Sequence, residues 1–368
     1  MTARYIGLMS GTSLDAIDLV MVEFGTPAIT WWVKESTPFP ADLRQAILTA
    51  QSTRTVTLPQ IIEWEFRLGE CYAKTILDHV SQEDLETVRA VGSHGQTLWH
   101  QPPGSDNPFP GSLQIGDPNI IAERTGRPVV ADFRRMDMAA GGEGAPLVTA
   151  FHQQYLSHNN ERRAIVNLGG IANITLLDGQ RIVAGFDSGP ANSLLDAWIQ
   201  NTLQEACDVG GNWARQGRVN EVLLEAMLAD PYFQRMPPKS TGREYFGLTW
   251  LRTCLEGFPE ISAEDIQATL LELTAVTIVN SIQTLGFDTD RLILCGGGVN
   301  NAYLVQRIRA QAGCPVESSE SYGLSPKWLE ATAFAWLAMR RVQDQSGNVP
   351  ESTGAHHAAI LGGLYQPI

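Results

Sequence analysis

Short runs of Gly, Ser, Thr and Asn follow apolar stretches at three places in the chain, and each run could bind a phosphate group. The first comes directly after residues 5–9 and continues into two aspartates. Small side chains leave the backbone uncovered, so amide groups can point at an anion and Gly11 can take a positive φ. A carboxylate just past such a cradle is well placed to hold Mg²⁺ through water, which predicts Asp15 and Asp18 as metal-binding residues. The predicted ATP- or phosphate-binding residues of this run are Ser10, Gly11, Thr12, Ser13, Leu14, Asp15, Ala16, Ile17 and Asp18.

The other two runs repeat this design later in the chain. An apolar stretch from residue 164 meets a pair of glycines, and a further stretch reverses at Asp178-Gly179, which is a strong hairpin signal. The third run follows a predicted buried strand at 291–295 and precedes a helical pattern at 302–312, an order that can bind a nucleotide. The residues predicted to bind phosphate in these runs are Asn167, Gly169, Gly170, Gly296, Gly297, Gly298 and Asn300.

The glycine spacing argues against two common nucleotide-binding motifs. No Gly-Lys-Ser or Gly-Lys-Thr closes any run, and none has the spaced glycines of a dinucleotide fingerprint. The first run taken alone could be an ordinary turn, but a similar opening in each half of the chain describes the two-lobed architecture of the actin, hexokinase and heat-shock chaperone ATPases. We therefore predict an α/β fold of this actin-like, ribonuclease-H-like kind: two lobes, each a mixed sheet flanked by helices, with the active site in the cleft between them.

Asp187 is the predicted catalytic base. It lies between Gly185 and Gly189, which permit a tight exit from a strand, and Pro190 then stiffens the approach to a helix expected to begin near Asn192. If ATP sits between the phosphate loops, positioning and charge neutralisation around its γ-phosphoryl group are the protein's main tasks. From spacing alone, a helix N-cap or turn carboxylate is the commoner role for an aspartate in this setting.

Seven segments, in order along nearly the whole chain, resemble those of the anhydro-N-acetylmuramic acid kinase family. They are YIGLMSGTSLDAID from residue 5, SHGQT from 93, QIGDP from 114, DFRR from 132, NLGGIAN from 167, GFDSGPAN from 185 and CGGGVNN from 295. The chain departs from the family pattern at Ala16 and Ala191, where glycine is more usual. Both changes are small and concern local loop geometry.

The resemblance implies an ATP-dependent kinase that uses Mg²⁺ and acts on 1,6-anhydro-N-acetylmuramic acid. This sugar has no free O6, so water must attack C1 while the departing bridge oxygen attacks the γ-phosphorus. The implied product is N-acetylmuramic acid 6-phosphate, which feeds peptidoglycan recycling, and the family's catalytic aspartate corresponds to Asp187, which takes the proton from water. Glu330 is a possible second carboxylate beside the water, with a surface or cap role as the alternative.

The segment 93–97 predicts a sugar-binding turn, because hydroxyl, imidazole and amide groups suit the hydroxyl, N-acetyl and lactyl oxygens of the substrate. The guanidinium groups at 134 and 135 could bind a carboxylate or phosphate, with a salt bridge to Asp132 or Asp137 as the alternative. The predicted substrate-binding residues are His94, Gln96, Thr97 and Arg134. No histidine pair has a helix-borne metal spacing, so Mg²⁺ brought with ATP is the only metal expected.

Two other functions fit the same residues. Another sugar or amino-sugar kinase of this fold would use Asp187 to deprotonate a substrate hydroxyl and would consume no water. A non-catalytic ATP-dependent switch would keep the phosphate loops but would lack a small-molecule pocket. The SHGQT and DFRR segments argue against the switch.

The apolar periodicity predicts where the lobes and their main elements lie. The first lobe is expected at 1–130, completed by about 350–368, and the second at 131–349. A Pro- and Gly-rich loop at 101–111 could wall the substrate cleft. The long apolar helix could be a core helix or a dimer interface. Helices are predicted at 41–51, 58–79, 264–286 and 330–343, and a strand at 88–92.

Composition excludes some partners. The 368 residues give a prior of about two domains, and a formal net charge of −14 argues against nucleic acid or an anionic membrane as a principal partner. Five cysteines without a Cys-x-x-Cys pair favour reduced thiols over disulfides or zinc. No signal segment or membrane-spanning run is evident, so we expect a cytoplasmic enzyme, and a homodimer is predicted without direct support.

Overall fold

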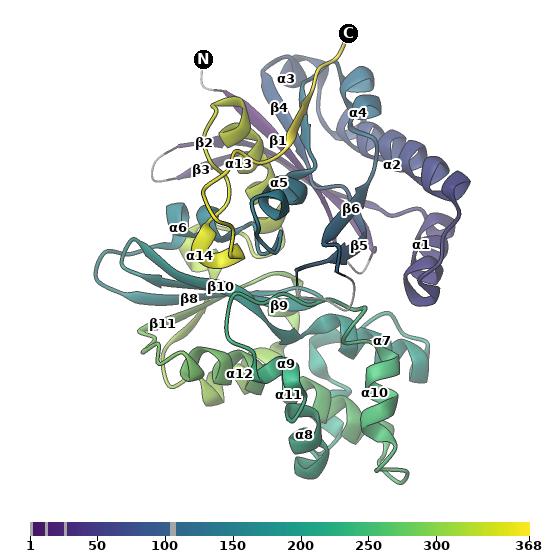
Figure 1. The fold of residues 1–368 in the computed structure, drawn as a ribbon, viewed down its shortest axis with the longest axis vertical. Coiled ribbons are helices and arrows are strands. Elements are labelled where there is room, and N and C mark those ends of the chain that lie inside the picture. The colour runs from purple at the N-terminus through teal and green to yellow at the C-terminus, as the bar shows by residue number, and fades with distance from the viewer. Residues whose placement is uncertain (1–2, 12–13, 26–27, 104–107) are drawn as a thin grey trace. The chain divides into compact units, whose positions relative to one another are not determined.

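The computed structural model describes residues 3–11, 14–25, 28–103 and 108–368. Thr12 and Ser13, both predicted to bind phosphate, lie outside these described residues. The chain forms two compact units, whose elements are labelled in Figure 1. Unit 1 consists of Met1–Phe151 and Trp328–Ile368, and unit 2 consists of His152–Lys327.

Unit 1 is built on a six-stranded mixed sheet. Its strands are β1 (Arg4–Ser10), β2 (Ala16–Phe24), β3 (Ile29–Pro38), β4 (Val88–Ser93), β7 (Val129–Ala131) and β13 (Gly363–Tyr365), in the order β13-β7-β4-β1-β2-β3. The antiparallel hairpin of β1 and β2 carries the first phosphate run, whereas β4 is parallel to both β1 and β7. A separate hairpin joins β5 (Gln96–Gln101) to β6 (Gly111–Ile115) around the predicted Pro- and Gly-rich loop.

Helices pack on both faces of this sheet. The helices of unit 1 are α1 (Ala41–Thr53), α2 (Leu58–His79), α3 (Gln82–Glu86), α4 (Pro118–Thr125), α5 (Phe133–Ala139), α13 (Leu329–Val342) and α14 (Pro350–Thr353), and α6 (Thr149–Leu156) crosses the unit boundary. The backbone of α13 lies so close to the sheet that a Cβ at Gly7 would come within 1.8 Å of the Ala331 carbonyl oxygen. Ile6 and Leu8 alternate with Gly7, so they point to the other face and pack with α1 and α2.

Unit 2 is built on a five-stranded mixed sheet. Its strands are β8 (Arg162–Leu168), β9 (Ile171–Asp178), β10 (Arg181–Pro190), β11 (Arg291–Cys295) and β12 (Val316–Ser318), in the order β10-β9-β8-β11-β12. The predicted hairpin is present, with Gly179 at φ +61 between β9 and β10. The α-helices are α7 (Asn192–Leu203), α8 (Glu221–Leu228), α9 (Pro231–Gln234), α10 (Leu248–Leu255), α11 (Ala263–Thr284) and α12 (Ala302–Gln311), and 3₁₀ turns span Val209–Gly211, Ala214–Gln216, Gly297–Asn300 and Ser319–Tyr322.

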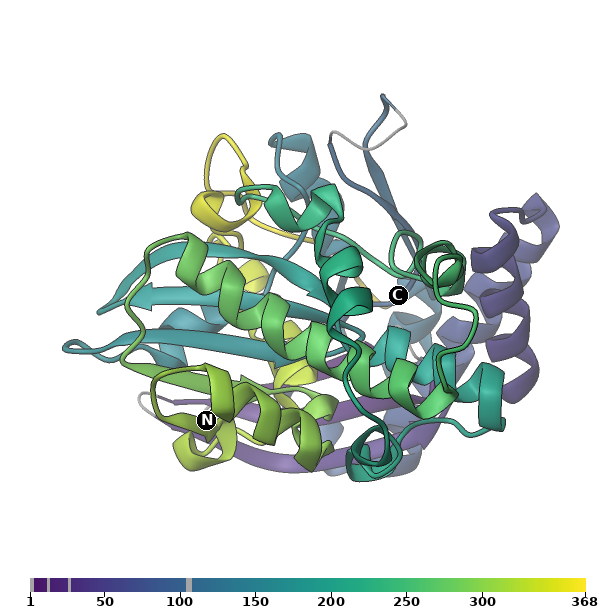
Figure 2. The same cartoon turned by 90° about the horizontal axis from the view of Figure 1, so that it is seen from below.

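The long helix α11 is the core helix of unit 2. Figure 2 shows it in light green, running across the strands of the unit 2 sheet. Along its 22 residues, Leu270, Leu271, Leu273 and Ile278 are buried in one cluster with side chains from β8, β9 and β10. This packing accounts for the apolar character of α11, so the helix gives no support to a dimer interface.

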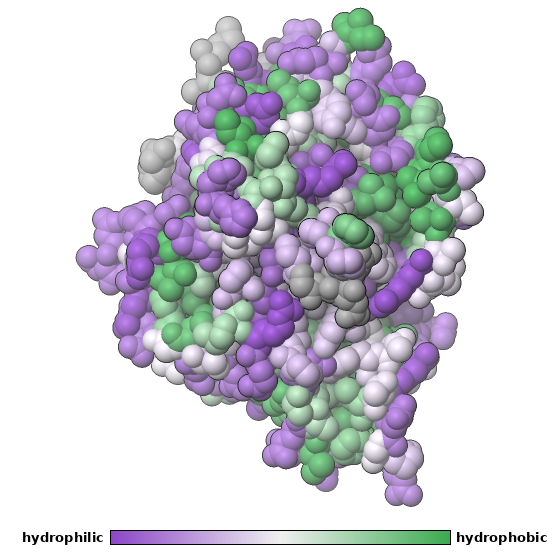
Figure 3. Space-filling view, in the orientation of Figure 1, coloured by the Kyte–Doolittle hydropathy of each residue, from purple (hydrophilic) through white to green (hydrophobic). Residues whose placement is uncertain are grey.

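The surface of unit 1 carries an apolar stripe on α2. Leu58, Ile62 and Phe66 follow one another at four-residue intervals, and each is more than half exposed. Apolar side chains gather beside α2 in Figure 3, which shows further apolar patches on the same face. Within the described ranges, the structure contains no helix both long enough and apolar enough to cross a bilayer.

The predicted α/β class, with a mixed sheet and flanking helices in each of two units, is confirmed. The unit boundaries at 151 and 328 differ from the positions 130 and 350 chosen from the sequence. One reason is that α13 packs against β1 and β4, so its residues belong with unit 1. The predicted helices at 41–51, 58–79, 264–286 and 330–343 correspond to α1, α2, α11 and α13, and the predicted strand at 88–92 corresponds to β4.

Candidate active site

Three of the predicted segments lie at one edge of the unit 2 sheet. β8 and β10 both run antiparallel to β9, and β11 runs parallel to β8, so these three strands share one direction. Gly169 follows β8, Asp187 lies near the end of β10, and Gly296 follows β11. The carboxyl ends of strands in an open α/β sheet are the usual place for a ligand.

The carboxylate of Asp187 is buried and accepts hydrogen bonds from Asn173 and Thr241. Asp187 is only 3% exposed. Asn173, directly opposite in the β9–β10 register, donates through Nδ2 to Asp187 Oδ1. The backbone amide of Thr241 donates to Oδ2 at 3.0 Å. Asp187 does not cap the following helix, because the N-cap residue of α7 is Ala191. Hydrogen bonds to a charged acceptor fix the orientation of this carboxylate.

The segment after α9 holds the backbone of Asp187. β10 is the edge strand of its sheet, and the Asp187 amide donates to the Lys239 carbonyl oxygen at 3.1 Å. The Tyr232 hydroxyl donates to the Asp187 carbonyl oxygen at 2.8 Å. A bulge between Asp187 and Gly189 shifts the register just beyond this point. The position of the carboxylate therefore depends on residues about fifty positions further along the chain.

The glycine runs of unit 2 are closely fitted to their neighbours. The amides of Asn192 and Ser193, at the start of α7, each donate at 3.1 Å to the carbonyls of Gly169 and Gly170. Gly296 has φ +82, and a Cβ there would lie 2.3 Å from Asn167 Oδ1. A Cβ at Gly297, by contrast, would meet nothing within 4 Å. This loop therefore has a closely packed side and an open side.

The other residues predicted to bind phosphate in these runs are Asn167, Gly298 and Asn300. Asn167 donates through Nδ2 to Asn173 Oδ1 at 3.3 Å, so a chain of amides reaches Asp187. A Cβ at Gly298 would lie 2.7 Å from the Leu168 Cβ, and Asn300 ends the 3₁₀ turn that contains Gly297 and Gly298.

The described part of the first phosphate run has mixed roles. The Ser10 hydroxyl shares a 2.7 Å hydrogen bond with the Tyr72 hydroxyl. Leu14 has φ +55 and is fully buried, and Ile17 is fully buried in the same core. The Leu14 amide donates to the Gly11 carbonyl at 3.1 Å, and Ala16 begins β2.

The two predicted metal-binding carboxylates contact different elements. Asp15 is exposed and lies 3.3 Å from the Arg44 guanidinium on α1. Asp18, on β2, accepts a 2.6 Å hydrogen bond from the Ser36 hydroxyl on β3. Among the described residues, no group of three or more His, Cys, Asp or Glu side chains is arranged to hold a metal ion.

The predicted sugar-binding turn in unit 1 brings His94 and Arg134 together. His94 Nε2 accepts from the Arg134 guanidinium, with an Nη2 distance of 2.8 Å, while Nδ1 lies 2.7 Å from the Gly95 carbonyl oxygen. Burial, reinforced by the Arg134 charge, holds the pKa of His94 well below its usual range. His94 is therefore a neutral imidazole at pH 7, which donates from Nδ1 and accepts at Nε2. Arg134 also donates to the Gly144 carbonyl at 2.8 Å, whereas Arg135 pairs with Asp132 at 2.7 Å.

Four buried oxygen atoms near this turn have no hydrogen-bond partner within the described chain. Thr97 contacts the three glutamines among them: its carbonyl accepts from Gln51 Nε2 at 3.0 Å and from Gln96 Nε2 at 3.3 Å, and its hydroxyl accepts from Gln114 Nε2 at 3.1 Å. Leaving a buried polar group unsatisfied costs about 1–3 kcal/mol. Such a cluster is therefore suited to a ligand rich in hydroxyl and amide groups. The four atoms are Ser93 Oγ, Gln96 Oε1, Gln51 Oε1 and Gln114 Oε1.

Glu330 lies in the first turn of α13 in unit 1 and is half-buried. It does not cap this helix, whose N-cap residue is Trp328. The cap alternative considered from the sequence therefore does not apply to Glu330.

Several residues that shape the site were not selected from the sequence. Gln51 lies on α1, and Gln114 begins the QIGDP segment and lies on β6, but neither was predicted to bind the substrate. Thr241 acts through its backbone amide, which any residue except proline could supply. Two of these residues stand in segments that the sequence motifs had marked: Gln114 in QIGDP, and Asn173 in NLGGIAN at the position opposite Asp187.

A buried carboxylate in unit 1 joins distant segments of the chain. Asp137 accepts from the Gly144 amide at 2.8 Å, from Asn348 Nδ2 at 2.7 Å and from the Thr353 hydroxyl at 2.7 Å. These contacts fix the loop that also presents the Gly144 carbonyl to Arg134. Asp137 is therefore a structural residue that positions one of the predicted substrate-binding side chains.

The fold is that of an α/β protein in which glycine runs and a buried, hydrogen-bonded carboxylate lie together at the carboxyl ends of the unit 2 strands. Comparison with known proteins identifies the family. The chain belongs to the anhydro-N-acetylmuramic acid kinase family, whose model matches residues 3–367. The resemblance that the sequence motifs indicated is thereby confirmed.

Named relatives match over nearly the full length. Proteins named anhydro-N-acetylmuramic acid kinase from Coxiella burnetii, Saccharophagus degradans and Vibrio vulnificus are each 45% identical to this chain. The matches cover 98–99% of this chain and 97–99% of the relatives. Among solved structures, the chain is similar to an activator of 2-hydroxyisocaproyl-CoA dehydratase from Clostridium difficile, with 14% identity, coverage of 93% and 96%, and a TM-score of 0.42. Likeness at that level carries no functional argument.

Proposed function

We propose that this protein is an ATP-dependent kinase that opens 1,6-anhydro-N-acetylmuramic acid with water and phosphorylates its O6. The products are N-acetylmuramic acid 6-phosphate and ADP, and the reaction belongs to peptidoglycan recycling. Family membership over residues 3–367 supports the substrate class. The observation that carries the mechanism is the carboxylate of Asp187, buried and held by Asn173 and Thr241 beside the glycine loops.

In this proposal Asp187 is the general base. Its carboxylate takes a proton from water as the water oxygen bonds to C1 of the sugar. The C1–O6 bond breaks, and the O6 electron pair forms the new bond to the γ-phosphorus, from which the bridging oxygen of ADP departs. Asn173 and Thr241 keep the carboxylate in one orientation, and positioned proton transfer of this kind contributes roughly 10²- to 10⁴-fold. Glu330 is the second carboxylate that we propose beside the water.

The turn at 93–97 is the proposed sugar site. Ser93 Oγ and Gln96 Oε1 are buried without a partner within the described chain, so they can contact sugar hydroxyl or amide groups. Arg134 carries a fixed charge and is oriented by His94 and by the Gly144 carbonyl. A guanidinium so held suits the lactyl carboxylate. Thr97 completes the turn and holds Gln51 and Gln114 in place.

ATP and Mg²⁺ are the proposed co-substrate and metal. The open side of Gly297, where a Cβ would meet nothing within 4 Å, fits phosphate oxygens, and Gly169 and Gly170 are proposed to bind phosphate with it. Asp15 and Asp18 supply only oxygen atoms, a donor set that fits Mg²⁺ held mainly by water and nucleotide phosphates. Mg²⁺ held there would neutralise phosphate charge. Residues 12 and 13 remain part of the proposed phosphate loop.

A cytoplasmic homodimer is the setting that we propose for this enzyme. A second copy of the chain is the partner proposed for the α2 stripe of Leu58, Ile62 and Phe66, because exposed apolar patches favour association. Native mass spectrometry would show a dimer that Ile62→Asp dissociates, with Lys74→Asp as the control on the same helix. A monomeric wild type would contradict this part of the proposal.

Labelled water tests the reaction directly. The full-length protein is incubated with Mg-ATP and the anhydro sugar in ¹⁸O-water, and the product is analysed by mass spectrometry. A phosphorylated sugar carrying one heavy oxygen at C1 is expected. The unlabelled product kept in ¹⁸O-water for the same time is the control for exchange at the anomeric centre. Phosphorylation without a heavy oxygen would favour another sugar kinase, and no phosphorylation at all would refute the assignment.

A further inference from the structure

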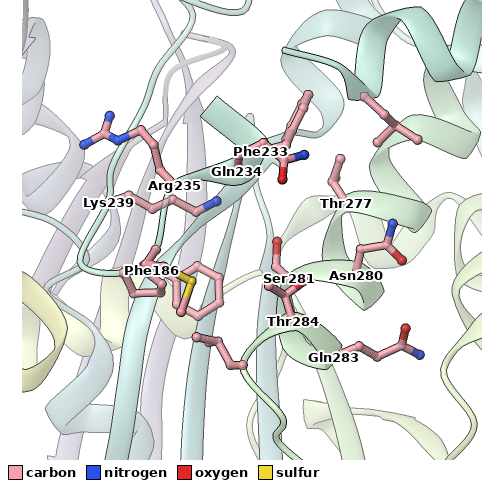
Figure 4. A pocket seen from close by; sticks show the side chains of 14 residues that line it. Phe186, Phe233, Gln234, Arg235, Lys239, Thr277, Asn280, Ser281, Gln283 and Thr284 are labelled. Carbon is pink, nitrogen blue, oxygen red and sulfur yellow. The ribbon is translucent and has the colours of Figure 1, made fainter. Parts of the chain in front are cut away.

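Unit 2 contains a cavity that the proposed reaction does not use. Its volume is about 210 Å³, and it is lined by β10, by α9 with the segment after it, and by the second half of α11 (Figure 4). None of the described glycine-run residues lines it. The lining consists of Phe186, Leu228, Phe233, Gln234, Arg235, Met236, Pro237, Lys239, Thr277, Asn280, Ser281, Gln283, Thr284 and Leu285.

The lining is positively charged in a chain that is strongly negative. Lys239 and Arg235 contribute two cations, and no Asp or Glu is present among the described lining residues. The whole chain, by contrast, carries a formal net charge of −14. A concave surface lined by one sign of charge concentrates the opposite ion.

Lys239 is a buried cation whose ammonium group points into this cavity. The residue is 3% exposed, and Nζ donates to the Tyr232 carbonyl oxygen at 3.3 Å and lies 4.7 Å from the Tyr232 ring centroid. An ammonium group has three protons to donate, so this contact leaves further capacity for a ligand. Burial lowers the pKa of Lys239 to about 8, aided by Arg235 and opposed by Asp187. The group is therefore still mostly charged at pH 7.

Neutral hydrogen-bonding groups complete the lining. Ser281 offers a hydroxyl from α11, and Gln234 and Asn280 offer side-chain amides, all labelled in Figure 4. The Thr277 hydroxyl donates to the Thr274 carbonyl oxygen at 3.2 Å. At roughly 30 Å³ for each water, the cavity would hold about seven waters. That space suits a small anion with some hydration and is too small for a nucleotide.

We propose that this cavity binds a small oxyanion, a carboxylate or phosphate group, through the Lys239 ammonium and the Ser281 hydroxyl of α11, with the Arg235 guanidinium, which points away in Figure 4, adding positive charge nearby. The cavity and the side chain of Asp187 lie on opposite faces of β10. Phe186 lines the cavity, and neighbouring residues of a strand point to opposite faces, so Asp187 faces away from it. The two sites nevertheless share backbone, because the Lys239 carbonyl accepts from the Asp187 amide. Oxyanion binding does not depend on the proposed catalytic function.

The low lysine content makes a direct test possible. The chain has four lysines, at 34, 74, 239 and 327, so full-length protein labelled with [¹³Cε]lysine gives four side-chain signals. The Lys239→Met variant assigns one signal by its loss. If that variant does not fold, Lys34→Met, Lys74→Met and Lys327→Met assign the same signal by elimination. Each signal is followed against pH, first in chloride, then with inorganic phosphate, then with acetate, at constant ionic strength.

We expect the Lys239 signal to titrate below the other three and to move upward by about one pH unit when the anion binds, because a bound anion favours the charged form. Lys34, Lys74 and Lys327 should not respond. A response to phosphate alone identifies a phosphate site, whereas a response to both anions identifies a general carboxylate and phosphate site. A Lys239 signal unmoved by saturating anion, or one that moves equally with the other three, would overturn the proposal.

Discussion

Replacing Asp187 by Asn is the most informative single perturbation, because it keeps the size of the side chain and removes its basicity. An amide cannot take a proton from water at neutral pH. If Asp187 is the general base, kcat should fall by roughly 10²- to 10⁴-fold. This loss corresponds to about 3–5 kcal/mol in the activation barrier, at about 1.36 kcal/mol for each tenfold change.

The contacts of the carboxylate also set the expected cost in stability. The Thr241 amide can donate only, so the side-chain oxygen of the substituted asparagine must face it. The new NH₂ group then faces Asn173 Nδ2, another donor. Asn173 can satisfy it only by flipping its amide, which breaks the 3.3 Å contact from Asn167. One lost hydrogen bond is worth about 1 kcal/mol and an unsatisfied donor up to about 3 kcal/mol. The free energy of unfolding of Asp187→Asn, measured in urea, should therefore be lower than that of the wild type by an amount within this range.

Coupled assays of ADP release and single-turnover measurements would give kcat, and urea titrations would give the stability. Asn173→Ala is the matched control, because it removes the same hydrogen bond but leaves the base in place. We expect it to lose comparable stability and much less rate. A folded Asp187→Asn enzyme that keeps more than a tenth of wild-type kcat would refute the role of Asp187.

Three further predictions concern other parts of the structure. Ser93→Ala should raise the KM for the sugar by about 10-fold or more and should leave the unliganded protein no less stable in urea, because Ser93 Oγ has no partner within the described chain. An unchanged KM would contradict a sugar contact. Gly296→Ala should destabilise unit 2 by at least about 1 kcal/mol in thermal melts, because the alanine would have φ +82 and would place its Cβ 2.3 Å from Asn167 Oδ1. Gly297→Ala should be close to neutral in the same measurement, and equal effects of the two variants would refute the packing argument. Burial lowers the pKa of His152 to about 3, so below about pH 6.5 the unfolded chain binds a proton that the folded chain does not, and stability falls with acidification. In His152→Gln the slope of the unfolding free energy against pH, between pH 6 and 4, should fall by up to about 1.4 kcal/mol per pH unit. An unchanged slope would show that His152 does not contribute.

The sequence predicted those parts of the molecule whose signals are local. The helix at 58–79 has a strong apolar pattern and the capping box at Thr57, and the structure gives the same bounds to α2. The Asp178-Gly179 turn and the helix starting at Asn192 are also specified by neighbouring residues. The placement of Gly169, Asp187 and Gly296 at one sheet edge follows from strands that the sequence indicated one at a time.

Other parts depend on contacts between residues far apart in the chain, and a single sequence does not show these. The partners of Asp187 include Thr241, and those of Asp137 include Asn348 and Thr353. The predicted loop at 101–111 lies between two paired strands, whose pairing involves Gln114 and Thr97. Lys239 had no recognisable motif, because its environment is created by α11, about forty residues later.

The division of unit 1 into two stretches of chain has a consequence for synthesis on the ribosome. Unit 2 is continuous, from His152 to Lys327, so all of its residues have been translated before any of the last 41 residues of unit 1 appear. Until α13 emerges, Gly7 and the strand around it have nothing on the face that the helix will cover. Domains generally fold as units while synthesis proceeds. The nascent chain should therefore complete its second unit first, and the apolar face of the β1–β4 sheet should be a binding surface for chaperones until α13 has left the ribosome.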